Sequence, residues 1–160
     1  MIIIMGVSGC GKTTIGLALS KQLDLPYYDA DDFHSQVNIE KMKNAIPLND
    51  QDRKPWLETL AKNIKIWNEQ GGGILSCSAL KESYRQILSL DNNITWVYLK
   101  GTFKLIQSRL EQREGHYMTS ALLHSQFEVL EEPNYGLHIN IDATPELLVS
   151  KIISKLKAYG

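Results

Sequence analysis

The chain opens with MIIIMGVSGCGKTT, residues 1–14, in which a continuously apolar run is followed by a glycine-rich turn. A short apolar run of this kind predicts a strand that is buried on both faces. From Thr13 to Leu23, apolar side chains recur at helical spacing. Residues 6–13 match the pattern G-x-x-x-x-G-K-S/T, and they lie in the strand–turn–helix context that the pattern requires. The stretch therefore predicts a phosphate-binding loop between a first strand and a first helix.

The residue types of this loop suit the binding of an anion. Glycines allow the backbone to curl so that successive N–H groups face a phosphate, and the helix N-terminus adds positive potential at the same place. Lys12 is expected to reach the β- and γ-phosphates of ATP, and the hydroxyl of Thr13 to bind Mg²⁺. The residues expected to hold the nucleotide are Gly6, Val7, Ser8, Gly9, Cys10, Gly11, Lys12, Thr13 and Thr14. A glycine turn that only caps a helix is the alternative, and the register of strand, turn, Lys-Thr and helix disfavours it.

Strand and helix signals alternate along the rest of the sequence. Further strands are expected at residues 26–29, 74–77, 94–99 and 137–141, and further helices at 38–44, from about 55 to 70, at 81–88, at 102–113 and from 145 onward. Pro55 is expected in the first turn of the long helix, where its missing N–H costs little. The alternation predicts an α/β fold in three layers, a five-stranded parallel sheet with helices on both faces. We expect one domain over residues 1–160.

Composition limits the classes of protein to which the chain can belong. The 160 residues are 43% hydrophobic and 22% charged, which is typical of a globular domain. Seventeen basic and eighteen acidic residues give a net charge of −1, which argues against a nucleic-acid partner. No apolar run approaches the roughly 20 residues of a membrane span, so no membrane partner is expected. Two cysteines, Cys10 and Cys77, fit a cytoplasmic protein, and both are expected near the carboxyl edge of the sheet.

Two carboxylates, Asp29 and Asp31, follow the second predicted strand. The guanine-reading and D-x-x-G motifs of GTPases are missing from the sequence, and the third strand ends at Cys77 without an acidic residue. Because parallel strands end at one edge of a sheet, the two carboxylates should lie near the phosphate loop. In an extended chain they point opposite ways, so Asp29 is expected to position the metal and Asp31 to accept a proton from a substrate hydroxyl. A solvated loop with a helix cap is the alternative.

Only four of the seventeen basic residues are arginines: Arg53, Arg85, Arg109 and Arg113. Arginine is the side chain best suited to forked recognition of phosphate or carboxylate. Arg109 and Arg113 are four residues apart, hence on one helix face, and they precede a glycine-containing segment. We expect both to close over the phosphates as part of a mobile lid at about residues 113–126. A surface face of ion pairs is the alternative.

The chain resembles the gluconokinase family over its whole length. The matching blocks are residues 6–13, YDADDFH (28–34), NIEKM (38–42), PLNDQDRKPWL (47–57), CSALKESYR (77–85), REGHYM (113–118) and SQFE (125–128). The blocks at 47–57 and 77–85 are far more specific than the phosphate loop. The resemblance implies a P-loop NTPase fold of the nucleoside-monophosphate-kinase branch. It also implies a Mg²⁺-dependent transfer of phosphate from ATP to the 6-hydroxyl of D-gluconate, commonly by a homodimer.

The residues expected around the substrate agree with this resemblance. Gluconate carries one carboxylate and a row of hydroxyls, so its pocket needs a cationic fork and several polar groups. The fork is expected from Arg53, Lys81 and Arg85, which leaves open the cation that meets the carboxylate. Asp31 and His34 are expected to contact hydroxyls. Two alternatives are kept: a small-metabolite kinase of shikimate or adenylate type, and a non-catalytic ATP-binding sensor.

Overall fold

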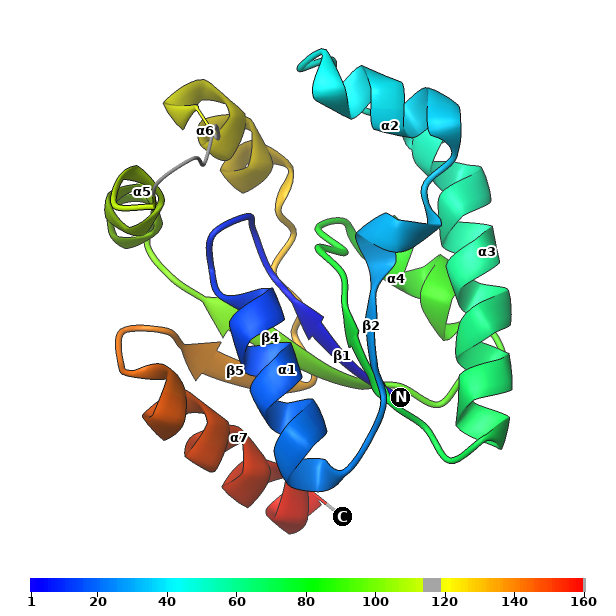
Figure 1. Cartoon of the computed structure of the whole chain (residues 1–160), viewed down its shortest axis with the longest axis vertical. Coiled ribbons are helices and arrows are strands. Elements are labelled where there is room, and N and C mark those ends of the chain that lie inside the picture. The colour runs from blue at the N-terminus through cyan, green and yellow to red at the C-terminus, as the bar shows by residue number, and fades with distance from the viewer. Residues whose placement is uncertain (114–118, 160) are drawn as a thin grey trace.

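A computed structural model of the chain describes residues 1–113 and 119–159. Helices and strands alternate as the sequence predicts (Figure 1). The elements, in chain order, are β1 (Ile2–Met5), α1 (Lys12–Leu23), β2 (Tyr27–Asp29), the 3₁₀ helix η1 (Ala30–Phe33), α2 (Gln36–Lys43), α3 (Asp50–Glu69), β3 (Ile74–Ser76), α4 (Glu82–Ser89), β4 (Thr95–Lys100), α5 (Phe103–Glu111), α6 (Ser120–Val129), β5 (Leu137–Asn140) and α7 (Pro145–Tyr159).

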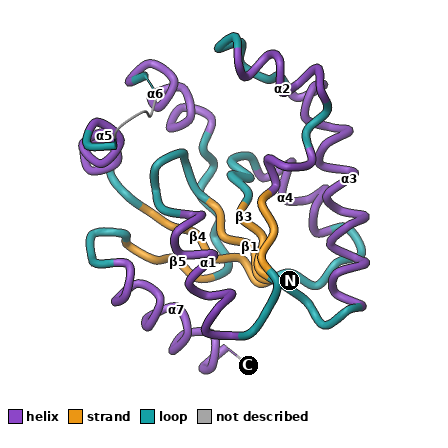
Figure 2. Tube along the Cα trace, in the orientation of Figure 1, coloured by secondary structure: helices purple, strands orange, loops and turns teal. Residues whose placement is uncertain are grey.

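The five strands form one parallel sheet in the order β2-β3-β1-β4-β5. In the register of the central strand, Ile4 lies opposite Ser76 of β3 on one side and Val97 of β4 on the other. Figure 2 shows the strands at the centre of the molecule with helices on either side. The predicted α/β class, the five-stranded parallel sheet and the helices on both faces are confirmed. All carboxyl ends of the strands therefore meet at one edge of the sheet.

Successive side chains of β1 enter different halves of the core. Ile4 packs with buried residues of α1, α5 and α7, whereas Ile3 and Met5 pack with those of α3 and α4. All three side chains are fully buried. A strand covered by helices on both faces requires apolar side chains at every position, and this explains the uninterrupted run at the start of the sequence.

The long helix α3 begins earlier than the sequence analysis predicted. The side chain of Asn49 accepts a hydrogen bond from the Asp52 N–H at 2.8 Å, and the carboxylate of Asp52 accepts one from the Asn49 N–H at 3.0 Å. This capping box starts the helix at Asp50. Pro55 therefore lies inside the helix, and its predicted place in the first turn is wrong. The reciprocal pair satisfies two free N–H groups, which decides where the helix begins.

The helices α2 and α6 stand on opposite sides of the carboxyl edge, with the loop between β1 and α1 between them (Figure 1). Thr102 caps α5 as predicted, because its hydroxyl accepts from the Leu105 N–H at 3.2 Å. Trp67 of α3 stacks on Tyr28 of β2, with ring centroids 3.8 Å apart, and so fixes the edge strand to the helix layer. Within residues 1–113 and 119–159, no helix is both long and apolar enough to cross a membrane.

Candidate active site

The phosphate loop connects the end of β1 to the start of α1. Gly9 and Gly11 have φ angles of +82° and +102°, a region that side-chain-bearing residues rarely adopt. Gly11 occupies the cap position of α1 and has no side chain with which to bind the first helical N–H groups. These groups are therefore available to an anion, and the positive end of the helix faces the same point.

Lys12 lies across the loop that it belongs to. Its ammonium group donates to the carbonyls of Gly6 and Val7, both at 3.0 Å. Thr13 and Thr14 are exposed in the first turn of α1. The structure thus brings the predicted phosphate and metal ligands of this loop together at the carboxyl edge. Their contacts with a nucleotide stay predictions.

Ser76, at the end of β3, is hydrogen-bonded to the backbone of the phosphate loop at Lys12, and the sequence analysis missed this role. Its hydroxyl donates to the Lys12 carbonyl at 3.0 Å and accepts from the Tyr27 hydroxyl at 2.9 Å. It is one of the few buried polar side chains of the described chain. A serine inside an otherwise apolar strand was the available signal, because a buried hydroxyl needs a partner.

Asp29 ends β2 and caps the 3₁₀ helix that follows. Its carboxylate accepts from the Asp31 N–H at 3.0 Å. The backbone turns after Asp29, so the expectation that both carboxylates lie on an extended chain is wrong. The buried indole of Trp56 donates to the Ala30 carbonyl at 2.7 Å and fixes this turn. Asp31 is thereby held by two neighbouring bonds and projects from the first turn of η1.

The carboxylates of Asp29 and Asp31 share an electrostatic environment with Lys12. Partial burial raises the pKa of both carboxyl groups, and the charge of Lys12 acts on both in the opposite direction. The Asp31 side chain is 79% exposed, yet protein surrounds it at longer range and reduces its hydration. A carboxylate with a raised pKa is a stronger base than a free one.

The oxygen ligands at this edge suit a magnesium ion that is shared with phosphates. A hydroxyl (Thr13) and a carboxylate (Asp29) are hard ligands of the kind that Mg²⁺ prefers. Among the described residues, no group of three histidine, cysteine or acidic side chains could enclose a metal. Mg²⁺ commonly uses one or two protein ligands and takes the rest from water and phosphate, so the residues present fit it.

His34 lies next to the acid pair, in a confined position. Its imidazole stacks on the indole of Trp56, and Nε2 lies 3.9 Å from the Asp31 carboxylate. Burial, aided by the positive charge of Arg53, lowers the pKa of His34 to about 4. The imidazole is therefore neutral at pH 7. The amide of Asn38 lies 3.3 Å from Nδ1 and can only donate there, which assigns the ring proton to Nε2, on the side of Asp31.

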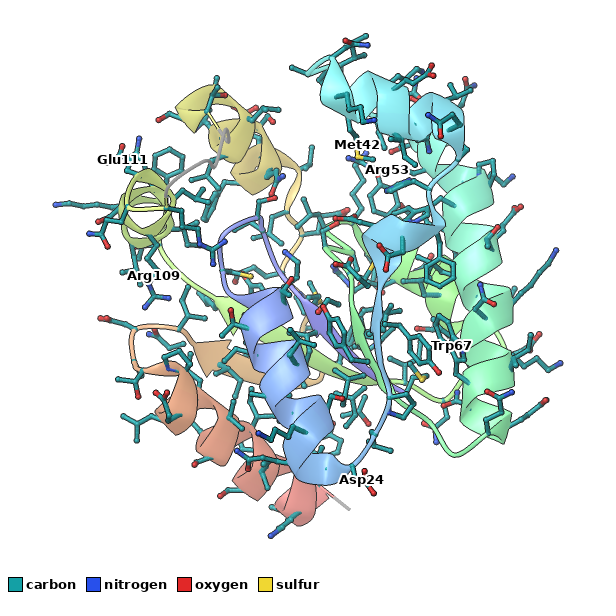
Figure 3. All side chains as sticks on the ribbon, viewed as in Figure 1. Asp24, Met42, Arg53, Trp67, Arg109 and Glu111 are labelled. Carbon is teal, nitrogen blue, oxygen red and sulfur yellow. The ribbon has the colours of Figure 1, made fainter. Side chains whose placement is uncertain are left out.

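Arg53 and Lys81 line one hollow of about 430 Å³ between the start of α3, the start of α4 and the end of α6. Its other lining residues are Leu48, Asn49, Asp50, Gln51 and Val129. Arg53 donates to the Tyr84 hydroxyl at 3.0 Å, and Lys81 pairs with Asp50 at 3.0 Å. Figure 3 shows Arg53 reaching from α3 toward the space below α2 into which Met42 also points. The charged side chains that line the hollow are two cations, Arg53 and Lys81, and one carboxylate, Asp50. The net positive charge makes the hollow suited to an anionic group.

Arg85 does not belong to this hollow, which corrects its predicted role in the substrate fork. The side chain is 1% exposed. Its guanidinium donates to the carbonyls of Ala79, Leu80 and Glu131, and also to the Glu82 carboxylate and the Tyr135 hydroxyl. These partners occupy every nitrogen of the group. Arg85 therefore ties the loop before α4 to the segment after α6 and leaves no donor for a substrate.

The predicted lid arginines lie at the end of α5. Arg109 donates to the Ile141 carbonyl at 2.8 Å, pointing toward the loop after β5 (Figure 3). Arg113 is exposed just beyond the helix. Residues 114–118, the centre of the predicted lid, lie outside the described residues. After these residues, the Gln126 side chain of α6 forms hydrogen bonds with Ser8 of the phosphate loop, a contact that the sequence analysis missed.

Both cysteines lie beneath this edge, as expected. Cys10 and Cys77 are buried free thiols. Burial raises the pKa of the Cys77 thiol to about 12. The thiol is therefore protonated at neutral pH and is a poor nucleophile.

Comparison with known proteins places the chain among small-molecule kinases. Residues 8–156 match the sequence model of the shikimate kinase family. The chain is 40% identical to the thermoresistant gluconokinase of Escherichia coli, with 97% of this chain and 92% of that protein covered. It is also 40% identical to a probable gluconokinase of Dictyostelium discoideum, with 98% and 86% covered.

The chain belongs to the gluconokinase family. The crystal structure of a gluconokinase from Sinorhizobium meliloti superposes with a TM-score of 0.91 at 33% identity, covering 99% of this chain and 91% of that one. Membership of the gluconokinase family identifies the chain as a P-loop kinase. It confirms the resemblance found in the sequence.

Proposed function

We propose that this protein transfers the γ-phosphate of ATP to the 6-hydroxyl of D-gluconate. One observation carries the proposal: the phosphate loop, Asp31 and a hollow with two cations share one edge of the sheet, in a chain about 40% identical to gluconokinases over nearly all its length. A triphosphate, a proton acceptor and a carboxylate site are what this transfer needs.

The nucleotide binds at the phosphate loop. The N–H groups of the loop and of the first turn of α1 surround the phosphates, and Lys12 exchanges the carbonyls of Gly6 and Val7 for phosphate oxygens. Thr13 and Asp29 are the residues that would hold Mg²⁺. The ion neutralises phosphate charge when it is bound.

Asp31 receives the proton of the attacking hydroxyl. Its raised pKa favours this role, and η1 holds it beside the loop. The Nε2 proton of His34 faces the same carboxylate and orients a substrate hydroxyl. Because the imidazole is neutral, it supplies a hydrogen bond without adding a charge to the site.

The substrate carboxylate binds in the hollow at Arg53 and Lys81. Tyr84 and Asp50 hold these cations in place before substrate arrives. A substrate carboxylate competes with Asp50 for Lys81, whereas Arg53 faces no carboxylate of its own in the hydrogen bonds described. Arg53 is therefore the principal carboxylate ligand, and Lys81 the second.

Arg109 and Arg113 act from the opposite side of the loop. As cations at the end of α5, they stabilise the charge that moves to the bridging oxygen during transfer. We propose that the region 113–126 acts as the lid that brings them to the phosphates. A homodimer and a cytoplasmic location stay predictions.

The test is a coupled assay of ADP release with three acceptors: D-gluconate, shikimate and AMP. We expect turnover with gluconate alone. Shikimate is the second candidate because the shikimate kinase family model matches residues 8–156. Activity with shikimate or AMP but not gluconate would reject the proposal. Tight ATP binding with no turnover on any acceptor would instead indicate a non-catalytic ATP sensor.

A further inference from the structure

Ser8 of the phosphate loop and Gln126 of α6 form a reciprocal pair. The Ser8 N–H donates to the Gln126 side-chain oxygen at 2.7 Å, and the Gln126 amide donates to the Ser8 hydroxyl at 3.0 Å. The two residues are 118 positions apart in the chain. Gln126 is half-buried, so the pair is partly shielded from competing water. A neutral amide is the side-chain group that both accepts and donates in this way without adding charge beside a triphosphate site.

The loop also rests on α5. A Cβ placed on Gly9 would lie 2.7 Å from Leu110 of α5, so the loop backbone and this helix are in direct contact. Two adjacent residues of the loop therefore contact two different helices. Ser8 is hydrogen-bonded to a side chain of α6, and Gly9 packs against a side chain of α5.

Helix α6 is bonded at both of its ends as well. Ser120, at its start, accepts from Gln107 of α5 at 2.6 Å. Just after its end, the Glu131 N–H donates to the Leu80 carbonyl at 2.8 Å, in the loop that precedes Lys81. Gln126 thus lies on a helix that spans from α5 to the substrate side. The Ser8–Gln126 pair therefore joins the phosphate loop directly to this helix.

We propose that Gln126 is a positioning residue. Through it, the position and stability of α6 depend on whether a nucleotide occupies the phosphate loop. It acts through Ser8 and does not itself touch the reacting atoms. The proposal deepens the proposed function and rests on it for the kinetic test. The binding test below needs nucleotide only, so it separates a failure of this coupling from a failure of the gluconate assignment.

The kinetic test compares Q126M with S125A. Methionine keeps the length of the side chain and removes both hydrogen bonds. Among the described residues, the Ser125 hydroxyl bonds within its own helix, to the Leu122 carbonyl. We expect Q126M to lower kcat roughly ten- to a hundredfold, as misplacement of reacting groups does. S125A should stay within twofold of the parent. A Q126M protein with kcat and KM for ATP within twofold of the parent would overturn the proposal.

The binding test measures amide hydrogen exchange of residues 119–130 with and without a non-hydrolysable ATP analogue. In the parent and in S125A, we expect the analogue to slow exchange in α6. In Q126M the analogue should still bind, with exchange in α6 unchanged by it. In Q126E the carboxylate still accepts from Ser8, so the slowing returns while KM for ATP rises through charge repulsion. Equal slowing in Q126M and the parent would overturn the coupling, as would Q126E exchange in α6 that the analogue leaves unchanged.

Discussion

The imidazole of His34 lies flat on the indole of Trp56, with ring centroids 4.1 Å apart and an angle of 16° between the planes. The contact joins the turn that carries Asp31 to the long helix α3. The burial of the imidazole, with a smaller contribution from the positive charge of Arg53, lowers the pKa of His34 and so disfavours its protonation.

His34→Phe should change how stability depends on pH. The pKa of His34 falls from 6.5 in the unfolded chain to about 4 in the folded protein, so between these values the unfolded chain binds the extra proton. The parent therefore loses stability as the pH falls through this window. Phenylalanine keeps the stacking and does not titrate. Urea unfolding at pH 5 and pH 8 should show the variant gaining stability relative to the parent at the lower pH. An identical difference between the two proteins at both values would contradict the shift.

Arg85→Met should destabilise the fold. The substitution leaves the carbonyls of Ala79 and Glu131 without the guanidinium donor. It also removes one of two donors from the Leu80 carbonyl and from the Glu82 carboxylate. Removing one partner of a buried charged network costs about 3–5 kcal/mol in the free energy of unfolding. Arg113→Met, at an exposed position, is the matched control and should change stability by about 0.5 kcal/mol or less. Equal urea midpoints for the two variants would refute the structural role of Arg85.

The contrast between these two arginines shows what the sequence could and could not predict. The strand, the loop and the helix of residues 2–23 are contiguous, so their local pattern is enough to predict the fold and the nucleotide site. The partners of Arg85 include a carbonyl 46 residues away, and the loop partner of Gln126 is 118 residues away. Residue type indicates that a buried arginine or glutamine needs hydrogen-bond partners. Only the packed chain determines whether those partners are backbone groups, other side chains or a substrate.

The errors in local structure have a different cause. Two sequence signals compete for the start of α3: Asn49 followed three residues later by Asp52, and the proline at position 55. The capping box prevails because its two hydrogen bonds fix the first turn, whereas a proline six residues into the helix is tolerated. Asp29 ends β2 as the sequence predicts, but its carboxylate also caps η1, which the strand pattern does not indicate. Aspartate side chains bond to nearby backbone as readily as to ligands, and this competition is decided by the geometry of the turn.

Gly9→Ala should weaken both the fold and nucleotide binding. A side chain at φ +82° is strained, and the added Cβ would lie 2.7 Å from Leu110. Gly72→Ala is the control, because Gly72 has a similar φ of +90° and no described residue lies within 4 Å of a Cβ added there. Both variants should lose about 1–2 kcal/mol from the backbone conformation. Gly9→Ala should lose a further 1–3 kcal/mol or so from overpacking, measured by urea unfolding. A rise in KM for ATP is expected in Gly9→Ala only, and equal values in the two variants would argue against this loop as the nucleotide site.

Lys12→Ala and Arg113→Ala should each lower turnover while leaving the fold intact. Each removes a preorganised cation from the phosphates, and the loss of one such group costs on the order of a hundredfold in kcat. Neither side chain belongs to the buried core. Thermal unfolding should therefore stay near that of the parent in both variants. Turnover within a few-fold of the parent in either variant would remove that residue from the proposed transfer site.

Asp31→Asn should lower kcat by about a hundredfold and remove the acidic limb of the pH profile. Burial raises the pKa of the Asp31 carboxyl above its usual value of 3.8. As the pH is lowered, the activity of the parent should therefore begin to fall before pH 3.8 is reached, because the base becomes protonated. Asparagine keeps the size of the side chain and cannot accept the proton, so the residual activity should be independent of pH over the same range. The measurement is kcat/KM for gluconate between pH 4 and 8 in both proteins. Asp32→Asn, at the exposed neighbouring position, is the control and should keep the parental turnover and an acidic limb. That limb should move to lower pH, because the charge of Asp32 contributes to the raised pKa of Asp31. If Asp31→Asn keeps the parental turnover and acidic limb, the proton acceptor is another group.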